Sequence, residues 1–247
     1  MQPAEPNAAT AAPGPVGVAH EITHAPAFAM LRVDLAPGEF LVAEAGAMVA
    51  RDQSVTMAVK LNASREAGFW AFLLALVVAL IRKLLGGETF IVNHFSALAG
   101  GSVWLAPAMA GDIQHRRLRG ETLVLSTGAY LAHSGDVKLG MRFGGLRGIL
   151  AKEGAFFLEV SGHGDLWFTS FGAIEVVDVD GGFTLDNGHL VGYEGQLTFQ
   201  IGSAGGGLMG LVASGEGLIC HFNGRGRIYV QSRNLQSLAG WISRILP

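Results

Sequence analysis

The chain reads Gly164-Asp165-Leu166-Trp167-Phe168, and the same five-residue pattern stands at Gly101-Ser102-Val103-Trp104-Leu105 and Gly226-Arg227-Ile228-Tyr229-Val230. The leading glycines, at positions 101, 164 and 226, are 63 and 62 residues apart. Similarity at a fixed period is typical of internal structural repeats. The pattern therefore predicts three copies of one unit of about sixty residues.

Two further patterns keep this period. A Gly-Glu pair precedes a Gly-Ala pair in the first two copies, at Gly38-Glu39 with Gly46-Ala47 and at Gly120-Glu121 with Gly128-Ala129. The third copy departs from it, with Gly181 in place of the glutamate and Gly188-His189 in place of Gly-Ala. A glutamate also precedes each copy of the five-residue pattern, at Glu88, Glu153 and Glu216. The glycines indicate turns or bends between strands.

The composition favours many short strands. Glycine provides 36 of 247 residues, about twice its usual share, while 50% of the chain is apolar and 15% is charged. Apolar and β-branched runs alternate with Gly-rich turns, as at Thr122–Ser126, Leu166–Ser170 and Gln196–Ile201. The formal net charge of -3 gives no general footprint for nucleic acid or anionic lipid. The single cysteine, Cys220, excludes an internal disulfide framework.

These features predict an all-β fold in which three repeats of about 60 residues form a pseudo-threefold β-prism. A single triplicated β domain is expected over residues 17–247, after a disordered Ala- and Pro-rich tail over residues 1–16. The prediction closes the prism by placing the first and last strands in one sheet, which removes free strand edges. Trp104, Trp167 and Tyr229 are expected to pack in the core at equivalent points.

One insertion interrupts the repeat between the first two copies. Thirteen consecutive apolar residues, Phe69–Ile81, lie within a helix predicted over about 66–85. At 1.5 Å per residue these thirteen span about 20 Å, which is short for a bilayer core. We expect an oligomer or membrane surface made by Ala67, Trp70, Ala71, Leu74, Ala75, Val78 and Ala79. A helix buried within its own chain is the alternative, and contact with a membrane through 69–85 stays open.

The carboxy-terminal segment predicts a second, short helix over about 235–246. Leu235, Leu238, Ile242 and Ile245 recur at helical spacing. We expect this helix to be amphipathic and to pack against the β-prism.

A search for chemistry finds no catalytic constellation. The glycine run Gly205–Gly210 matches a dinucleotide-binding pattern only formally, because no helix follows it. Cys220 and His221 are neighbours on a strand and point to opposite faces. The eight histidines lack zinc-type spacing and occupy unequal places in the three copies. We therefore expect no enzyme, no cofactor and no metal site.

A cluster of basic residues before the Gly120-Glu121 turn supports an alternative prediction of function. Arg116, Arg117 and Arg119 are predicted to lie in a loop that contacts a small ligand or RNA. Loop charges exposed to solvent are the simpler interpretation in an acidic protein, so a nucleic-acid partner is not favoured.

Further stretches resemble a known family. They are Pro37-Gly38-Glu39, Ala43–Met48, Gly87-Glu88, Pro107–Ile113, Asp186–Val191, Gly215–Gly217 and Tyr229–Arg233. These motifs are similar to those of the altered-inheritance-of-mitochondria (Aim-type) family, whose fold resembles the tryptophan RNA-binding attenuator protein. The resemblance covers about residues 18–234. It implies the β-prism and soluble bacterial members, links a mitochondrial branch to inner-membrane organisation, and supplies no catalytic residue.

The expected function is a non-enzymatic, homo-oligomeric β scaffold that acts through contacts with an unknown protein partner. We expect it in the cytoplasm, with a place at the inner face of a membrane as a further option. The alternative is the small-ligand or RNA-binding module at Arg116.

Overall fold

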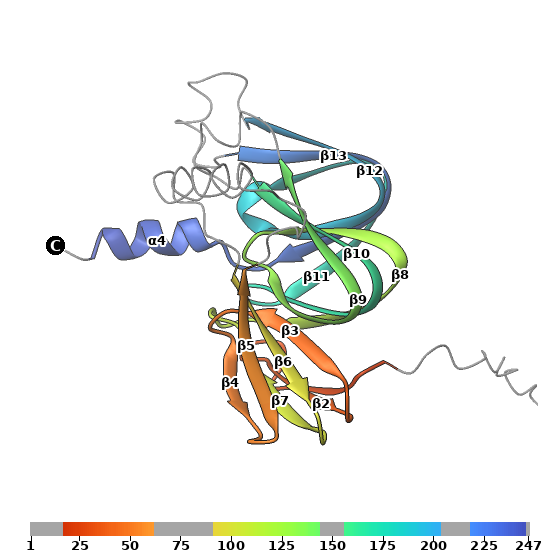
Figure 1. Ribbon diagram of the computed structural model, residues 1–247. Helices are drawn as coiled ribbons and strands as arrows, with labels where there is room; N and C mark the ends of the chain where they lie inside the picture. Colours follow the sequence, from red (N-terminus) through yellow and green to blue (C-terminus); the bar gives the residue numbers. More distant parts are fainter. Residues whose placement is uncertain (1–16, 62–90, 144–155, 204–217, 246–247) are drawn as a thin grey trace, which may run out of the picture.

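The computed structural model describes residues 17–61, 91–143, 156–203 and 218–245. Within these residues, strands form a four-stranded sheet and a nine-stranded sheet, and all neighbouring strands are antiparallel (Figure 1). The all-β prediction is confirmed. The strands are β1 (Ala19–Thr23), β2 (Met30–Leu35), β3 (Phe40–Glu44), β4 (Met48–Arg51), β5 (Val55–Leu61), β6 (Ile91–Ala97), β7 (Gly101–Leu105), β8 (Ile113–Ser126), β9 (Tyr130–Phe143), β10 (Phe156–Thr169), β11 (Ile174–Asp186), β12 (Leu190–Ser203) and β13 (Leu218–Gln231).

The same strand order recurs in each copy. The second repeat, β8 to β10, places β10 between β8 and β9, and the third repeat, β11 to β13, places β13 between β11 and β12. In the first repeat each long strand is broken into two, so β7 lies between β2 and β4 while β6 lies between β3 and β5. The last strand of every repeat is thus its middle strand. In Figure 1 the first repeat (orange to yellow) forms the lower part and the other two the upper part.

Neighbouring repeats share short stretches of sheet. Strand β12 pairs with β8 at Gly192–Glu194, and β9 pairs with β3 at Ala132 and His133. The expected sharing of a sheet by the first and last strands is wrong in the described residues, because β13 pairs with β11 and β12. The reason is that the first repeat supplies its own middle strands, β6 and β7. The sheets of the described residues are open, and the pseudo-threefold arrangement of the repeats stays a prediction.

Glycines bend the long strands at equivalent places. Gly162 in β10 and Gly224 in β13 have positive φ angles of 117° and 123°. A Cβ atom at either residue would lie 2.2 Å from a carbonyl oxygen of the neighbouring strand. Only glycine fits such a backbone without strain. The long strands of repeats two and three are thereby bent into two arms.

Three contiguous groups of buried apolar side chains form the core, one centred on each repeat. Trp167 and Tyr229 are buried as predicted. Trp104 is only partly buried, and the guanidinium carbon of Arg32 lies 5.3 Å from the centroid of its ring. The equivalent aromatics thus differ in environment from copy to copy.

The carboxy-terminal helix is present as α4 (Leu235–Ser243). The Asn234 side chain caps its amino end by accepting hydrogen bonds from the amides of Gln236 and Ser237. Its expected packing against the sheets is wrong, because α4 has no buried residue. Figure 1 shows the reason: the chain leaves β13 and carries α4 away from the strands.

The predicted helix over 66–85, with the contact residues assigned to it, lies outside the described residues. Within the described part of the chain, no helix is both long and apolar enough to cross a membrane.

Candidate functional site: a polar groove between the second and third repeats

An open groove of about 610 Å³ lies where the second and third repeats diverge. We call it the polar groove. Strands β8 and β12 pair only as far as Leu123 and Glu194, and the arms beyond these residues separate. The described wall carries four carboxylates and three guanidinium groups, from Glu121, Asp178, Asp180 and Glu194 and from Arg116, Arg225 and Arg227.

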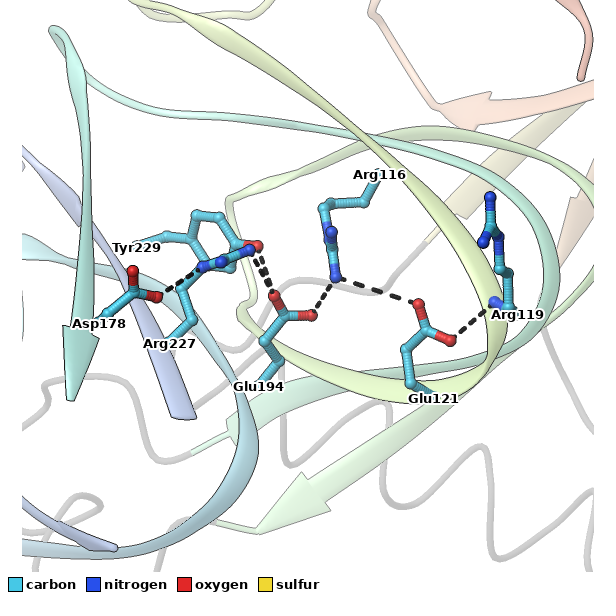
Figure 2. A network of polar contacts seen from close by, with 7 residues as sticks. All are labelled: Arg116, Arg119, Glu121, Asp178, Glu194, Arg227 and Tyr229. Atoms are coloured by element: carbon cyan, nitrogen blue, oxygen red, sulfur yellow. Dashed lines mark hydrogen bonds and ion pairs between the residues drawn. The ribbon is translucent and has the colours of Figure 1, made fainter. Parts of the chain in front are cut away.

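Glu194 joins the two sides of the polar groove (Figure 2). Its Oε2 lies 2.7 Å from Nη2 of Arg116 on β8. Its Oε1 accepts a hydrogen bond of 2.8 Å from the Tyr229 hydroxyl and lies 3.5 Å from Nη1 of Arg227. The Glu194 side chain is only 11% exposed, so a charge in this position requires these partners. The network therefore holds repeat two against repeat three.

Tyr229 and Arg227 of this network each keep one protonation state near neutral pH. Burial, the hydrogen bond to Glu194 and the negative charge of Glu194 raise the pKa of Tyr229 to about 12. Hydrogen bonds to Asp178 and Tyr229 raise the pKa of Arg227 further above its already high range. A general acid or base works best with a pKa near the working pH. These two side chains are therefore suited to positioning.

The structure separates the three arginines of the predicted basic loop. They lie on strand β8, where neighbouring side chains alternate between faces. Arg116 points to Glu194 in the polar groove, and Arg117 points to Asp165 with a separation of 2.6 Å. Arg119 is exposed, and its backbone amide donates to Glu121. The expected loop is wrong, because β8 runs on through the Gly120 bend, and the cations do not form one patch.

Sequence reasoning missed Asp165, which is 2% exposed and lies beneath the amino-terminal strand. Its carboxylate contacts Nε2 of His115 at 2.9 Å and accepts from the Val18 amide at 3.0 Å, besides its pair with Arg117. Burial favours the neutral acid, but the hydrogen bonds from His115, Arg117 and Val18, with the charge of Arg117, bring the pKa of Asp165 down to about 2. The centroids of the His20 and His115 imidazole rings are 4.3 Å apart.

The repeat itself contains the signal for these pairs. Strand pairing sets Asp165 opposite Arg117 in repeat two, and Arg227 opposite Asp178 in repeat three. The first repeat places Ser102 opposite Asp34 at the same point. The residue after the leading glycine of each five-residue pattern is therefore polar because it meets a charged cross-strand partner. Opposite charges that face each other across strands stabilise a sheet.

The described residues contain no group of three or more His, Cys, Asp or Glu side chains arranged to hold a metal ion. The carboxylates of the polar groove are instead in contact with guanidinium groups or a tyrosine hydroxyl. None of the described residues that line the groove favours a particular cofactor.

A triplicated all-β chain with a polar groove between repeats defines a class of β proteins built from internal repeats. The family model described as "Mitochondrial biogenesis AIM24" matches residues 20–233, and the chain belongs to this family. The resemblance read from the motifs is confirmed.

Two similar proteins come from Streptococcus pyogenes. An uncharacterised protein of serotype M6 is 33% identical over 229 residues, which span 89% of this chain and 88% of that protein. The crystal structure of another Streptococcus pyogenes protein aligns with a TM-score of 0.75 at 31% identity, covering 93% of this chain and all of that one.

Proposed function

We propose that this protein is a non-enzymatic, homo-oligomeric β scaffold that acts through protein contacts. In this proposal its three repeats form a pseudo-threefold prism. One observation carries the proposal: α4 bears apolar side chains that nothing in the described chain covers. Leu235, Trp241 and Ile242 are 52%, 60% and 38% exposed, and Ile245, two residues beyond the helix, is 60% exposed.

The length of α4 supports the proposal of a covering partner. Isolated helices shorter than about 12–15 residues are marginal in water. With nine residues and none buried, α4 gains little from the described part of the chain beyond the Asn234 cap. Burial of an exposed large apolar side chain contributes about 1.5–3 kcal/mol. Contact with a partner therefore supplies the stabilisation that the helix lacks alone.

A second copy of this chain is the occupant that the helix fits best. Leu235, Leu238 and Ile242 lie on α4 with spacings of three and four residues, as in the a and d pattern of a coiled coil, and Ile245 follows three residues later in the turn after the helix. Leucine and isoleucine in these positions form a seam that is complementary to itself. A two-fold pair of α4 helices would bury this seam in both protomers.

The polar groove agrees with a role without catalysis. Its buried carboxylate, Glu194, has Arg116, Arg227 and Tyr229 as partners, and a pKa of about 12 keeps the Tyr229 hydroxyl protonated near neutral pH. Groups satisfied in this way stabilise the joint between repeats.

Sedimentation equilibrium of the full chain tests the proposal. We expect an oligomer, and we expect Ile242→Asp to raise its dissociation constant at least 100-fold because a carboxylate would enter the apolar seam. Ser243→Asp is the matched control, since it adds the same charge one residue later, outside the seam. A monomeric full chain, or equal weakening by both variants, contradicts the proposal.

The place of the scaffold in the cell is a separate part of the proposal. We propose a cytoplasmic protein whose 69–85 segment offers contact with the inner face of a membrane or with protein. Fractionation of cells that express the full chain, or the chain without residues 67–85, distinguishes the two. Membrane association that survives high salt and requires the segment supports lipid contact, whereas a soluble full chain supports protein contact.

A further inference from the structure

The first two repeats show how one strand fills the space between neighbouring repeats. Strand β1 pairs antiparallel with the outer edge of β2, with Ala19 opposite Asp34 and Ile22 opposite Leu31. The same segment contacts repeat two, because the Val18 amide donates to Asp165 and the His20 ring lies 5.2 Å from the Trp167 ring. Strand β1 is therefore seated between repeats one and two.

The polar groove lies between repeats two and three, in the position that corresponds to that of β1 between repeats one and two. The cross-strand pairs show the correspondence: Arg117 with Asp165 in repeat two matches Asp178 with Arg227 in repeat three. Asp165 and Arg117 lie in the wall that β1 covers, and Asp178 and Arg227 line the polar groove. On the other side, β8 takes the place of β2 and contributes Arg116.

The edge of β8 beside this groove lacks the strand that β2 has. One edge of β8 pairs with β10 along its length. The other edge pairs with β12 at Leu123–Leu125, and no described strand pairs with it over residues 113–119. At the two ends of this stretch the amides of Ile113 and Arg119 already donate to the side chains of Asp112 and Glu121, so the edge that a further strand can join lies between these two residues. An unpaired strand edge presents amide and carbonyl groups that can bind another extended chain.

We infer that the polar groove binds an extended peptide segment of a partner protein, which adds an antiparallel strand to the Ile113–Arg119 edge of β8. The wall favours a segment with one lysine or arginine, because it has four carboxylates against three guanidinium groups. Asp178 and Asp180, whose side chains are 81% and 73% exposed, are the carboxylates in reach of such a cation. This inference deepens the proposed function, since it rests on a scaffold that acts through protein contacts.

A displayed library of random ten-residue peptides, selected on the full-length protein, tests the inference. We expect enriched sequences that carry one cationic residue among residues with high β-propensity. Asp180→Trp should weaken the selected peptides at least tenfold, because the indole would occupy the polar groove while replacing only an exposed ion pair. Asp136→Trp is the matched control, because Asp136 is exposed on β9 and does not line the groove.

Hydrogen exchange of the complex tests the strand addition itself. A bound strand should slow the exchange of backbone amides in residues 113–119, and peptides N-methylated at alternate residues should lose binding. Failure to enrich any sequence above the Asp180→Trp background overturns the inference, and so does binding without protection of β8. The Ile242→Asp variant separates the two proposals, because it removes the predicted helix seam and leaves the polar groove intact.

Discussion

At the scale of the residue, Asp165 shows how hydrogen bonds and an opposite charge stabilise a buried carboxylate. Three donors converge on it: the imidazole of His115, the guanidinium group of Arg117 and the amide of Val18. These donors come from two distant parts of the sequence, so Asp165 attaches the amino-terminal segment to repeat two. Trp167, two residues further along β10, supplies the apolar floor under His20 and His115. Asp165 thus contacts both the amino-terminal segment, at Val18, and strand β8 of repeat two, at His115 and Arg117.

The pKa of Asp165 predicts a pH dependence of the free energy of unfolding. The folded-state value of about 2 lies below the ordinary 3.8, so ionised Asp165 stabilises the folded state above about pH 4. We expect about 2 kcal/mol from this group, lost as the pH falls from about 4 to 2. Urea unfolding of the native protein and of Asp165→Asn across this range measures it. The variant should lack this part of the pH slope, and equal slopes would contradict the prediction.

At the scale of the element, alternation along β8 decides what each arginine does. Arg116 and Arg117 are neighbours in sequence, yet one contacts Glu194 and the other Asp165 on opposite sides of the strand. Carboxylates already neutralise both cations within the protein. A cluster of basic residues in a sequence therefore predicts an anion-binding patch only if the segment is a loop or if the residues share one face.

The β8 arginines are predicted to differ in their contribution to stability. Arg117→Gln should lower the free energy of unfolding by about 3 kcal/mol, because it leaves buried Asp165 without its cation. Arg119→Gln should change it by no more than about 0.5 kcal/mol, since this side chain is exposed. Urea midpoints of the two variants provide the comparison. If Arg119→Gln instead abolishes binding of a fluorescent RNA oligonucleotide at low salt, the alternative of an RNA-binding module gains support.

At the scale of the whole molecule, the period of about sixty residues was enough to predict an all-β chain with three copies. The glycine positions also predicted bends such as Gly120, which has a φ of 106°. The period did not predict which strands pair at the ends of the chain, because many pairings satisfy the same local pattern. The repeat pattern also could not show that β1, which lies before the first copy, fills a space between two copies. Asp165 stood in the repeat motif, but its burial depends on that long-range contact.

The contact between β1 and repeat two makes a prediction for the whole molecule. Deletion of residues 1–23 should lower stability, because it removes the strand that pairs with β2 and the Val18 amide that donates a hydrogen bond to Asp165. A synthetic peptide of residues 17–23 should restore stability by an amount that rises with the logarithm of its concentration. A peptide with an N-methylated backbone has the same side chains and should fail, since it lacks the amides that pair with β2. Thermal unfolding at increasing peptide concentration measures this.

If the deletion leaves the unfolding temperature unchanged, β1 is not a strand that fills an inter-repeat space. The analogy that assigns a peptide to the polar groove then loses its basis.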